Sequence, residues 1–199
     1  EGGASAAPDR YFPGRARTLP APRGRTVARF ATLNDLHFGE PRFGGMMTED
    51  HEYGDAAPGF PLVRETDGEV PYWQAMNEDV VADINAAGVD AVVIKGDIAD
   101  RGLRSQFEIA ARTFGGFQAP WHAFLGNHDH YGRNHGEEVD GYALLGQPRA
   151  PRAFDLGGWR LVLLDTVEPG DHHGVFPEER LRWLEHELDM LNNMSRTLP

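Results

Sequence analysis

The sequence contains no cysteine, which excludes disulfide bonds, thiolate metal sites and cysteine nucleophiles. It also lacks the Gly-x-x-x-x-Gly-Lys-Ser/Thr loop of nucleoside triphosphate sites and the Gly-x-Ser-x-Gly turn of serine hydrolases. No apolar run approaches the roughly 20 residues that a membrane-spanning helix needs. Basic residues are scarce, 19 against 31 acidic ones, and the formal net charge of −12 argues against nucleic acid polymers and anionic membranes as partners. Carboxylate, imidazole and amide side chains are therefore the first candidates for carrying chemistry.

The 199 residues are enough for one domain with a sizeable core. Residues 1–25 are rich in Gly, Ala, Pro and Arg without an apolar period, which predicts an extended N-terminal tail before a domain at 26–199. An irregular insertion covers 40–70 and is either a lid over a site or a solvated excursion, of which we favour the second. Because the chain begins with Glu1 rather than Met, a cytoplasmic protein and one exported after signal removal both stay open.

Three apolar runs rich in β-branched or aromatic residues predict buried strands at Val27–Leu33, Ala91–Ile94 and Trp121–Leu125. Each run is followed at once by acidic or histidine residues. The three segments are Asp35-Leu36-His37, Gly96-Asp97-Ile98-Ala99-Asp100 and Gly126-Asn127-His128-Asp129. With helices between them, these strands predict α/β layering around a largely parallel sheet, whose carboxyl-end edge is where ligands bind.

Two helices are predicted between these strands. Apolar residues recur at helical spacing from Tyr72 to Ala87, and Gly88 is expected to end that helix. Ser105-Gln106-Phe107-Glu108 matches a capping box, which predicts the start of the second helix at Ser105.

The C-terminal third adds different elements. Arg152–Leu156 and Trp159–Asp165, separated by Gly157-Gly158, predict a β-hairpin that begins a second sheet. Pro177 then opens a final helix that carries leucines at 181, 184, 188 and 191.

Aspartate, histidine and asparagine without cysteine form an oxygen and nitrogen ligand set that suits manganese, iron, zinc or cobalt. A carboxylate such as Asp97 can bridge two ions, which at about 3.5–4 Å apart clamp a phosphate ester and generate a hydroxide nucleophile. Each motif alone also has a structural explanation, since exit loops use Asp and His for turns and Arg101 could form a structural ion pair. The occurrence of all three motifs, each after a strand, favours the metal site.

At these residues the chain resembles the calcineurin-like metallophosphoesterases, whose blocks Asp-x-His, Gly-Asp-x-x-Asp and Gly-Asn-His-Asp/Glu occur here in order. The resemblance implies a four-layer α/β/β/α sandwich of two mixed sheets and two transition-metal ions, Mn, Fe or Zn. It implies that Asp35 and His37 bind the first metal, that Asp97 bridges, and that Asn127 binds the second.

The same resemblance assigns two further roles. His128 would contact the substrate and protonate the leaving oxygen, and Asp100 would orient it. This assignment is chemically sensible, because a histidine paired with a carboxylate is held in one tautomer.

A finer likeness covers Leu164-Asp165-Thr166 through His173-Gly174 and Arg182-Trp183-Leu184, which is similar to the bacterial class III cyclic-nucleotide phosphodiesterases. His172 and His173 are interpreted as loop histidines rather than metal ligands. The family's remaining ligands come from a later strand ending in His and from a Gly-His-x-His block, and neither precedes Pro199. We therefore expect that a C-terminal part of the catalytic domain is missing from this sequence. The alternatives are that a second chain or homo-oligomer completes the site, or that the protein is a diverged member with a half site.

The first functional hypothesis is a dinuclear-metal-dependent phosphoesterase that hydrolyses small phosphodiesters, with cyclic nucleotides as the leading substrate class, by metal-activated hydroxide attack. A phosphomonoesterase or a lipid-headgroup phosphodiesterase on the same fold is the nearest enzymatic alternative. A non-catalytic interaction module with an incomplete metal site is the alternative from another class.

Overall fold

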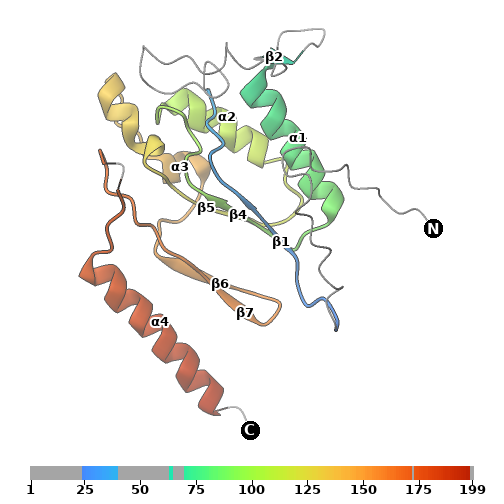
Figure 1. The fold of residues 1–199 in the computed structure, drawn as a ribbon, viewed down its shortest axis with the longest axis vertical. Helices are drawn as coiled ribbons and strands as arrows, with labels where there is room; N and C mark the ends of the chain where they lie inside the picture. Colours follow the sequence, from blue (N-terminus) through green and yellow to red (C-terminus); the bar gives the residue numbers. More distant parts are fainter. Residues whose placement is uncertain (1–23, 40–62, 65–69, 172, 198–199) are drawn as a thin grey trace, which may run out of the picture.

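A computed structural model describes residues 24–39, 63–64, 70–171 and 173–197 of the chain (Figure 1). The predicted tail at 1–25 and the insertion at 40–70 lie almost wholly outside the described residues. Within the described part, none of the helices is both long enough and apolar enough to cross a membrane.

The central sheet has three parallel strands in the order β1 (Phe30–Leu33), β4 (Ala91–Lys95) and β5 (Trp121–Phe124). The predicted parallel pairing is therefore confirmed. β1 is shorter than predicted, because Val27 is 56% exposed and the backbone pairs with β4 only from Phe30 onward. All three strands end beside one another, so the loops that follow them meet at one edge of the sheet.

The middle strand β4 explains how the core is divided. Residues 91–94 are all buried, as expected for a parallel strand covered on both faces. Val92 and Ile94 join the cluster formed with α1 (Tyr72–Ala87) and α2 (Arg104–Phe114). Val93 points to the opposite face, because successive side chains of a strand alternate. Figure 1 shows both helices on one side of the sheet and the hairpin on the other.

The first helix has the predicted bounds, and its Gly88 adopts a left-handed conformation with φ of 61° that ends it. The predicted capping box of the second helix is wrong. Leu103 is the N-cap of α2, and the Gln106 side chain accepts hydrogen bonds from the N–H groups of Leu103 and Arg101. Ser105 lies inside the first turn. The Gln106 side chain, rather than the Ser105 hydroxyl, bonds the backbone N–H groups at the start of the helix.

The hairpin is formed by β6 (Arg152–Leu156) and β7 (Trp159–Leu163), and both Gly157 and Gly158 have positive φ as predicted. It is a separate two-stranded antiparallel sheet, followed by α4 (Glu178–Thr197). In Figure 1 the order across the molecule is helices, parallel sheet, hairpin, α4. Neither of these two sheets is mixed within the described residues, so the complete four-layer sandwich of two mixed sheets stays a prediction.

Four short elements were not predicted. They are β2 (Val63–Arg64), which pairs with β3 (Val70–Pro71), the 3₁₀ helix η2 (His128–His135), and α3 (Gly141–Leu145). The sequence did hold a signal for α3, because Asp140 caps its N-terminus by accepting from the Ala143 N–H and Gly146 ends it with φ of 63°.

Candidate active site

The first two predicted motifs lie in loops that continue the parallel pairing of the sheet, with a parallel bridge between Phe38 and Ala99. The N–H of Leu36 donates to the Asp97 carbonyl at 2.9 Å, and the N–H of Phe38 donates to Ile98 at 2.7 Å. In the opposite direction, the Asp100 N–H donates to the Phe38 carbonyl at 3.2 Å. The first two motifs are thus fixed to each other by backbone hydrogen bonds before any side chain contributes.

Backbone conformation sets these loops apart. Asp35, His37 and Asp97 have φ angles of 55°, 44° and 50°, and no other non-glycine residue of the described chain has a positive φ. Side chains disfavour this region, and such residues persist where surrounding contacts hold them, commonly at functional sites. The three residues with this strain are also three of the four predicted metal ligands.

Two glycines allow the second and third motifs to approach closely. A Cβ on Gly96 would lie 2.7 Å from the Gly126 nitrogen, and a Cβ on Gly126 would lie 2.5 Å from the Asp97 nitrogen and overlap the Asp97 carboxylate. Real Cβ atoms do not come this close to backbone. The glycine of Gly-Asn-His-Asp is therefore required by the position of Asp97.

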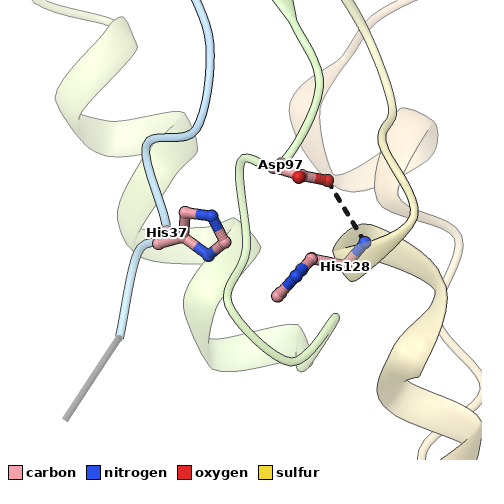
Figure 2. Close-up of side chains that lie close together, drawn as sticks. All are labelled: His37, Asp97 and His128. Atoms are coloured by element: carbon pink, nitrogen blue, oxygen red, sulfur yellow. Dashed lines mark hydrogen bonds between the residues drawn. The ribbon is translucent and has the colours of Figure 1, made fainter. Parts of the chain in front are cut away.

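Three side chains converge at this edge of the sheet. His37, Asp97 and His128 each place one ligand atom within 4.8 Å of the others. Figure 2 shows the two imidazoles facing the same space from different loops, with the Asp97 carboxylate accepting a hydrogen bond from the His128 N–H at 3.2 Å. The rings of His37 and His128 meet edge to face with centroids 4.5 Å apart. The structure thus places His128, predicted as the acid catalyst, among the possible ligands.

His37 is oriented by a buried carboxylate. Its Nδ1 lies 3.3 Å from Asp100 Oδ1, and the Asp100 side chain is only 6% exposed. A carboxylate accepts, so this contact places the proton on Nδ1 and the lone pair on Nε2. Nε2 lies 3.9 Å from Asp35 Oδ1, on the side where both could hold one ion. The predicted Asp35 and His37 pair is therefore close together, with Asp35 the more exposed partner.

Asp100 contacts His128 differently from what we expected. The His128 Nδ1 lies 2.9 Å from the backbone carbonyl of Asp100, while the Asp100 carboxylate is engaged with His37 and with Arg101 Nε at 3.5 Å. A carbonyl can only accept, so it holds the His128 proton on Nδ1 as a carboxylate would. Asp100 thereby contacts both histidines, one through its side chain and the other through its backbone.

Asn127 lies at the start of η2. Its Nδ2 donates to the Tyr131 hydroxyl at 2.8 Å, and the Tyr131 ring also packs 4.9 Å from His128. Asn127 and Asp97 line a hollow of about 210 Å³ whose other wall is formed by residues 166–167, 171 and 173–174 of the following loop. In that loop His173 pairs with Asp171 at 2.6 Å, and His172 lies outside the described residues.

Asp129 has a role that the sequence analysis did not assign. It is 2% exposed, and its carboxylate accepts from the N–H groups of Ala99 (2.7 Å), Gly126 (2.8 Å) and Ile98 (3.2 Å). Burial and, to a smaller extent, the charge of Asp97 raise the pKa of Asp129, the three N–H donors lower it, and the result is a pKa of about 7. Its place in Gly-Asn-His-Asp was the available signal. Asp129 ties the second loop to the third.

These residues fit divalent transition-metal ions. Imidazole nitrogen, carboxylate oxygen and amide oxygen are the donors that Mn, Fe and Zn accept, and one histidine is held in the correct tautomer by a carboxylate. Strained backbone and glycine contacts fix the ligand positions in advance.

A model of the family described as calcineurin-like phosphoesterase matches residues 28–199, which is most of the chain. The chain belongs to the calcineurin-like phosphoesterases. Members of this metallophosphoesterase family use divalent metal ions, in agreement with the donor set at the sheet edge.

Similar proteins in this family include named phosphodiesterases. The chain is 34% identical over 122 residues to a cAMP/cGMP dual specificity phosphodiesterase of Mycobacterium tuberculosis, covering 55% of this chain and 36% of that protein. It is 31% identical over 99 residues to the 3',5'-cyclic adenosine monophosphate phosphodiesterase CpdA of Escherichia coli K12, covering 50% and 34%. It is 29% identical over 101 residues to a protein of Arcobacter nitrofigilis named "Probable glycerophosphodiester phosphodiesterase GpdQ", covering 50% and 37%.

These matches cover about half of this calcineurin-like phosphoesterase and little more than a third of each relative. The matched share therefore leaves most of each relative's length without a counterpart in the alignment.

Proposed function

We propose that this protein is a metal-dependent phosphodiesterase that hydrolyses small phosphodiesters, with cyclic nucleotides as the leading substrates. The observation that carries the proposal is the convergence of His37, Asp97 and His128 within 4.8 Å at the edge of a parallel sheet. The phosphodiesterase names of three relatives from different organisms support it. The hollow of about 210 Å³ beside Asp97 and Asn127 offers space for a small ester.

Four residues would hold two ions. Asp35 and His37 would bind the first, Asp97 would contact both, and Asn127 would bind the second. Two such ions, when bound, supply Lewis acidity toward the phosphoryl oxygens and a nucleophile from water. Manganese, iron and zinc all accept these donors. The chain's part is to hold the donors at fixed separations, which the strained loops and the two glycine contacts do.

His128 would serve as the general acid. Its Nδ1 proton is held by the Asp100 carbonyl at 2.9 Å, so Nε2 is the atom that gains and releases a proton. Its backbone N–H donates to the Asp97 carboxylate at 3.2 Å, which fixes the position of His128 relative to Asp97. Proton transfer from Nε2 to the leaving oxygen would complete the cleavage of the ester bond.

The deciding experiment is hydrolysis of bis-nitrophenyl phosphate across a Mn²⁺ titration. Asp97→Asn removes the central carboxylate and is expected to abolish metal-dependent turnover. Asp90→Asn is the matched control, because Asp90 lies before the same strand and its carboxylate accepts from the exposed Arg29 N–H at 2.8 Å, away from the site. Turnover without added metal, or equal turnover in the Asp97→Asn variant, would refute the proposal.

Substrate class is tested separately. Mononitrophenyl phosphate, 3',5'-cyclic AMP and a glycerophosphodiester are compared at saturating Mn²⁺, and a preference for the monoester would refute the phosphodiesterase assignment. The glycerophosphodiester is included because one relative carries that name. Metal binding without turnover on any substrate would instead support the alternative that a second chain completes the site.

A further inference from the structure

A buried asparagine joins the first helix to the loop that carries Asp35 and His37. Asn77 lies in the second turn of α1 and is 1% exposed. Its Nδ2 donates to the Leu36 carbonyl at 3.0 Å and to the Trp73 carbonyl of its own helix at 2.8 Å. Both amide hydrogens are thereby used, one inside the helix and one across to the site loop.

The Leu36 carbonyl lies in the middle of the loop, between the two residues with positive φ. Leu36 lies between Asp35 and His37, whose φ angles are 55° and 44°. On one side the loop is held by the N–H groups of Leu36 and His37, which both donate to the Asp97 carbonyl at 2.9 and 3.0 Å. On the other side it is held by Asn77. The strained segment is therefore fixed between the Asp97 loop and α1.

Helix stability alone does not explain this residue. Asparagine is a poorer helix former than leucine, and the Asn77 Oδ1 is buried with no hydrogen-bond partner among the described residues. Its neighbours on the same side of the helix, Val81 and Ile84, are buried apolar residues. An apolar side chain would suit the packing, so the gain lies in the bond to Leu36.

We propose that Asn77 is a positioning residue of the metal site, which sets the separation of Asp35 and His37 by holding the carbonyl between them. The inference rests on the proposed metal-dependent function. Asn77 touches neither ion nor substrate; it acts through the Leu36 backbone. Groups that orient ligands in this way typically contribute about 10–100-fold to metal affinity.

The test measures Mn²⁺ affinity by isothermal titration calorimetry and thermal stability of the metal-free protein for the same variants. Asn77→Leu keeps the number and branching of the side-chain heavy atoms, removes the bond and improves helix propensity. The expected result is Mn²⁺ binding weakened by about 10–100-fold, while better helix propensity and removal of the unpaired Oδ1 offset part of the stability lost with the Leu36 bond. Asn77→Ala, measured in parallel, gives the same loss of affinity and guards against a variant that packs poorly.

Asn85 provides the matched control. It lies on the same helix, donates through Nδ2 to the Gly116 carbonyl at 2.8 Å and accepts from the Gln118 N–H at 2.9 Å, joining α1 to a loop away from the site. Asn85→Leu is expected to lower the melting temperature and leave Mn²⁺ affinity unchanged.

Outcomes separate this inference from the proposed function. Unaltered Mn²⁺ affinity in both Asn77 variants, with normal binding by the parent protein, would overturn the positioning role alone. A parent protein that binds no Mn²⁺ would overturn the metal site and the positioning role together. Equal losses of affinity for the Asn77 and Asn85 variants would show a general effect of α1 and would also overturn it.

Discussion

Replacing Asp129 by Asn should loosen the active-site loops although the side chain itself faces no substrate. The carboxylate uses both oxygens, Oδ1 for Ala99 and Oδ2 for Ile98 and Gly126. An amide keeps one acceptor oxygen. In its best orientation it retains the bonds to Ile98 and Gly126 and turns an NH₂ group toward the Ala99 N–H, which is left buried and unpaired.

The magnitude follows from these contacts. A hydrogen bond to a charged acceptor contributes about 1.5–3 kcal/mol, and an unsatisfied buried donor costs about 1–3 kcal/mol. Both figures describe the loss of the Ala99 bond, so they are not added together. Neutralising the carboxylate weakens the remaining two bonds, while removal of a buried charge offsets part of the loss. We expect the free energy of unfolding to fall by about 2–4 kcal/mol. For a chain of this size that corresponds to a melting temperature lower by about 4–16 °C.

The assay is differential scanning calorimetry at pH 8, above the pKa of about 7 to which burial raises the Asp129 carboxyl. Asp140→Asn is the control, because Asp140 is an exposed N-cap of α3, asparagine caps a helix equally well, and the surface ion pair with Arg149 at 2.7 Å contributes little. The control is expected to change stability by less than about 0.5 kcal/mol. If Asp129→Asn melted within about 1–2 °C of the parent, below the predicted shift of about 4–16 °C, the reasoning from its three N–H partners would be refuted.

Two further predictions concern other parts of the sheet. Gly126→Ala is expected to remove Mn²⁺ binding measured by calorimetry, because its Cβ would overlap the Asp97 carboxylate; binding at parental affinity would contradict the close packing of the two loops. His122 on β5 has a pKa held below its usual 6.5 by burial and by Arg152, so its contribution to stability is present above pH 6.5 and is lost as the pH falls below it. His122→Phe keeps the stacking on Phe154, whose ring lies 3.8 Å away, and urea unfolding at pH 7.5 and 5.0 should show a smaller loss on acidification than in the parent. An equal loss in both proteins would exclude His122 as the cause.

Local patterns were sufficient for the first helix and the hairpin, but not for the four short elements β2, β3, η2 and α3. The helix at Tyr72–Ala87 was predicted with its observed bounds, because amphipathic spacing and a following Gly are local properties. The hairpin was predicted for the same reason, since two glycines with positive φ join two apolar runs. The start of α2 was predicted wrongly, because the choice between Ser105 and Leu103 as N-cap depended on how far the Gln106 side chain reached back.

The sequence by itself determined which residue types lie at the ends of three strands, and hence the family and the chemistry that the site can support. Only the tertiary structure decided how those residues are oriented. The division of Asp100 between His37 and His128, the bonds from the Ile98 and Ala99 N–H groups to Asp129 and the bond from Asn77 to Leu36 all join residues far apart in the chain. Such pairings depend on the packing of α1 and on the register of β1, β4 and β5. Neither can be predicted from the spacing of residues within a short stretch of sequence.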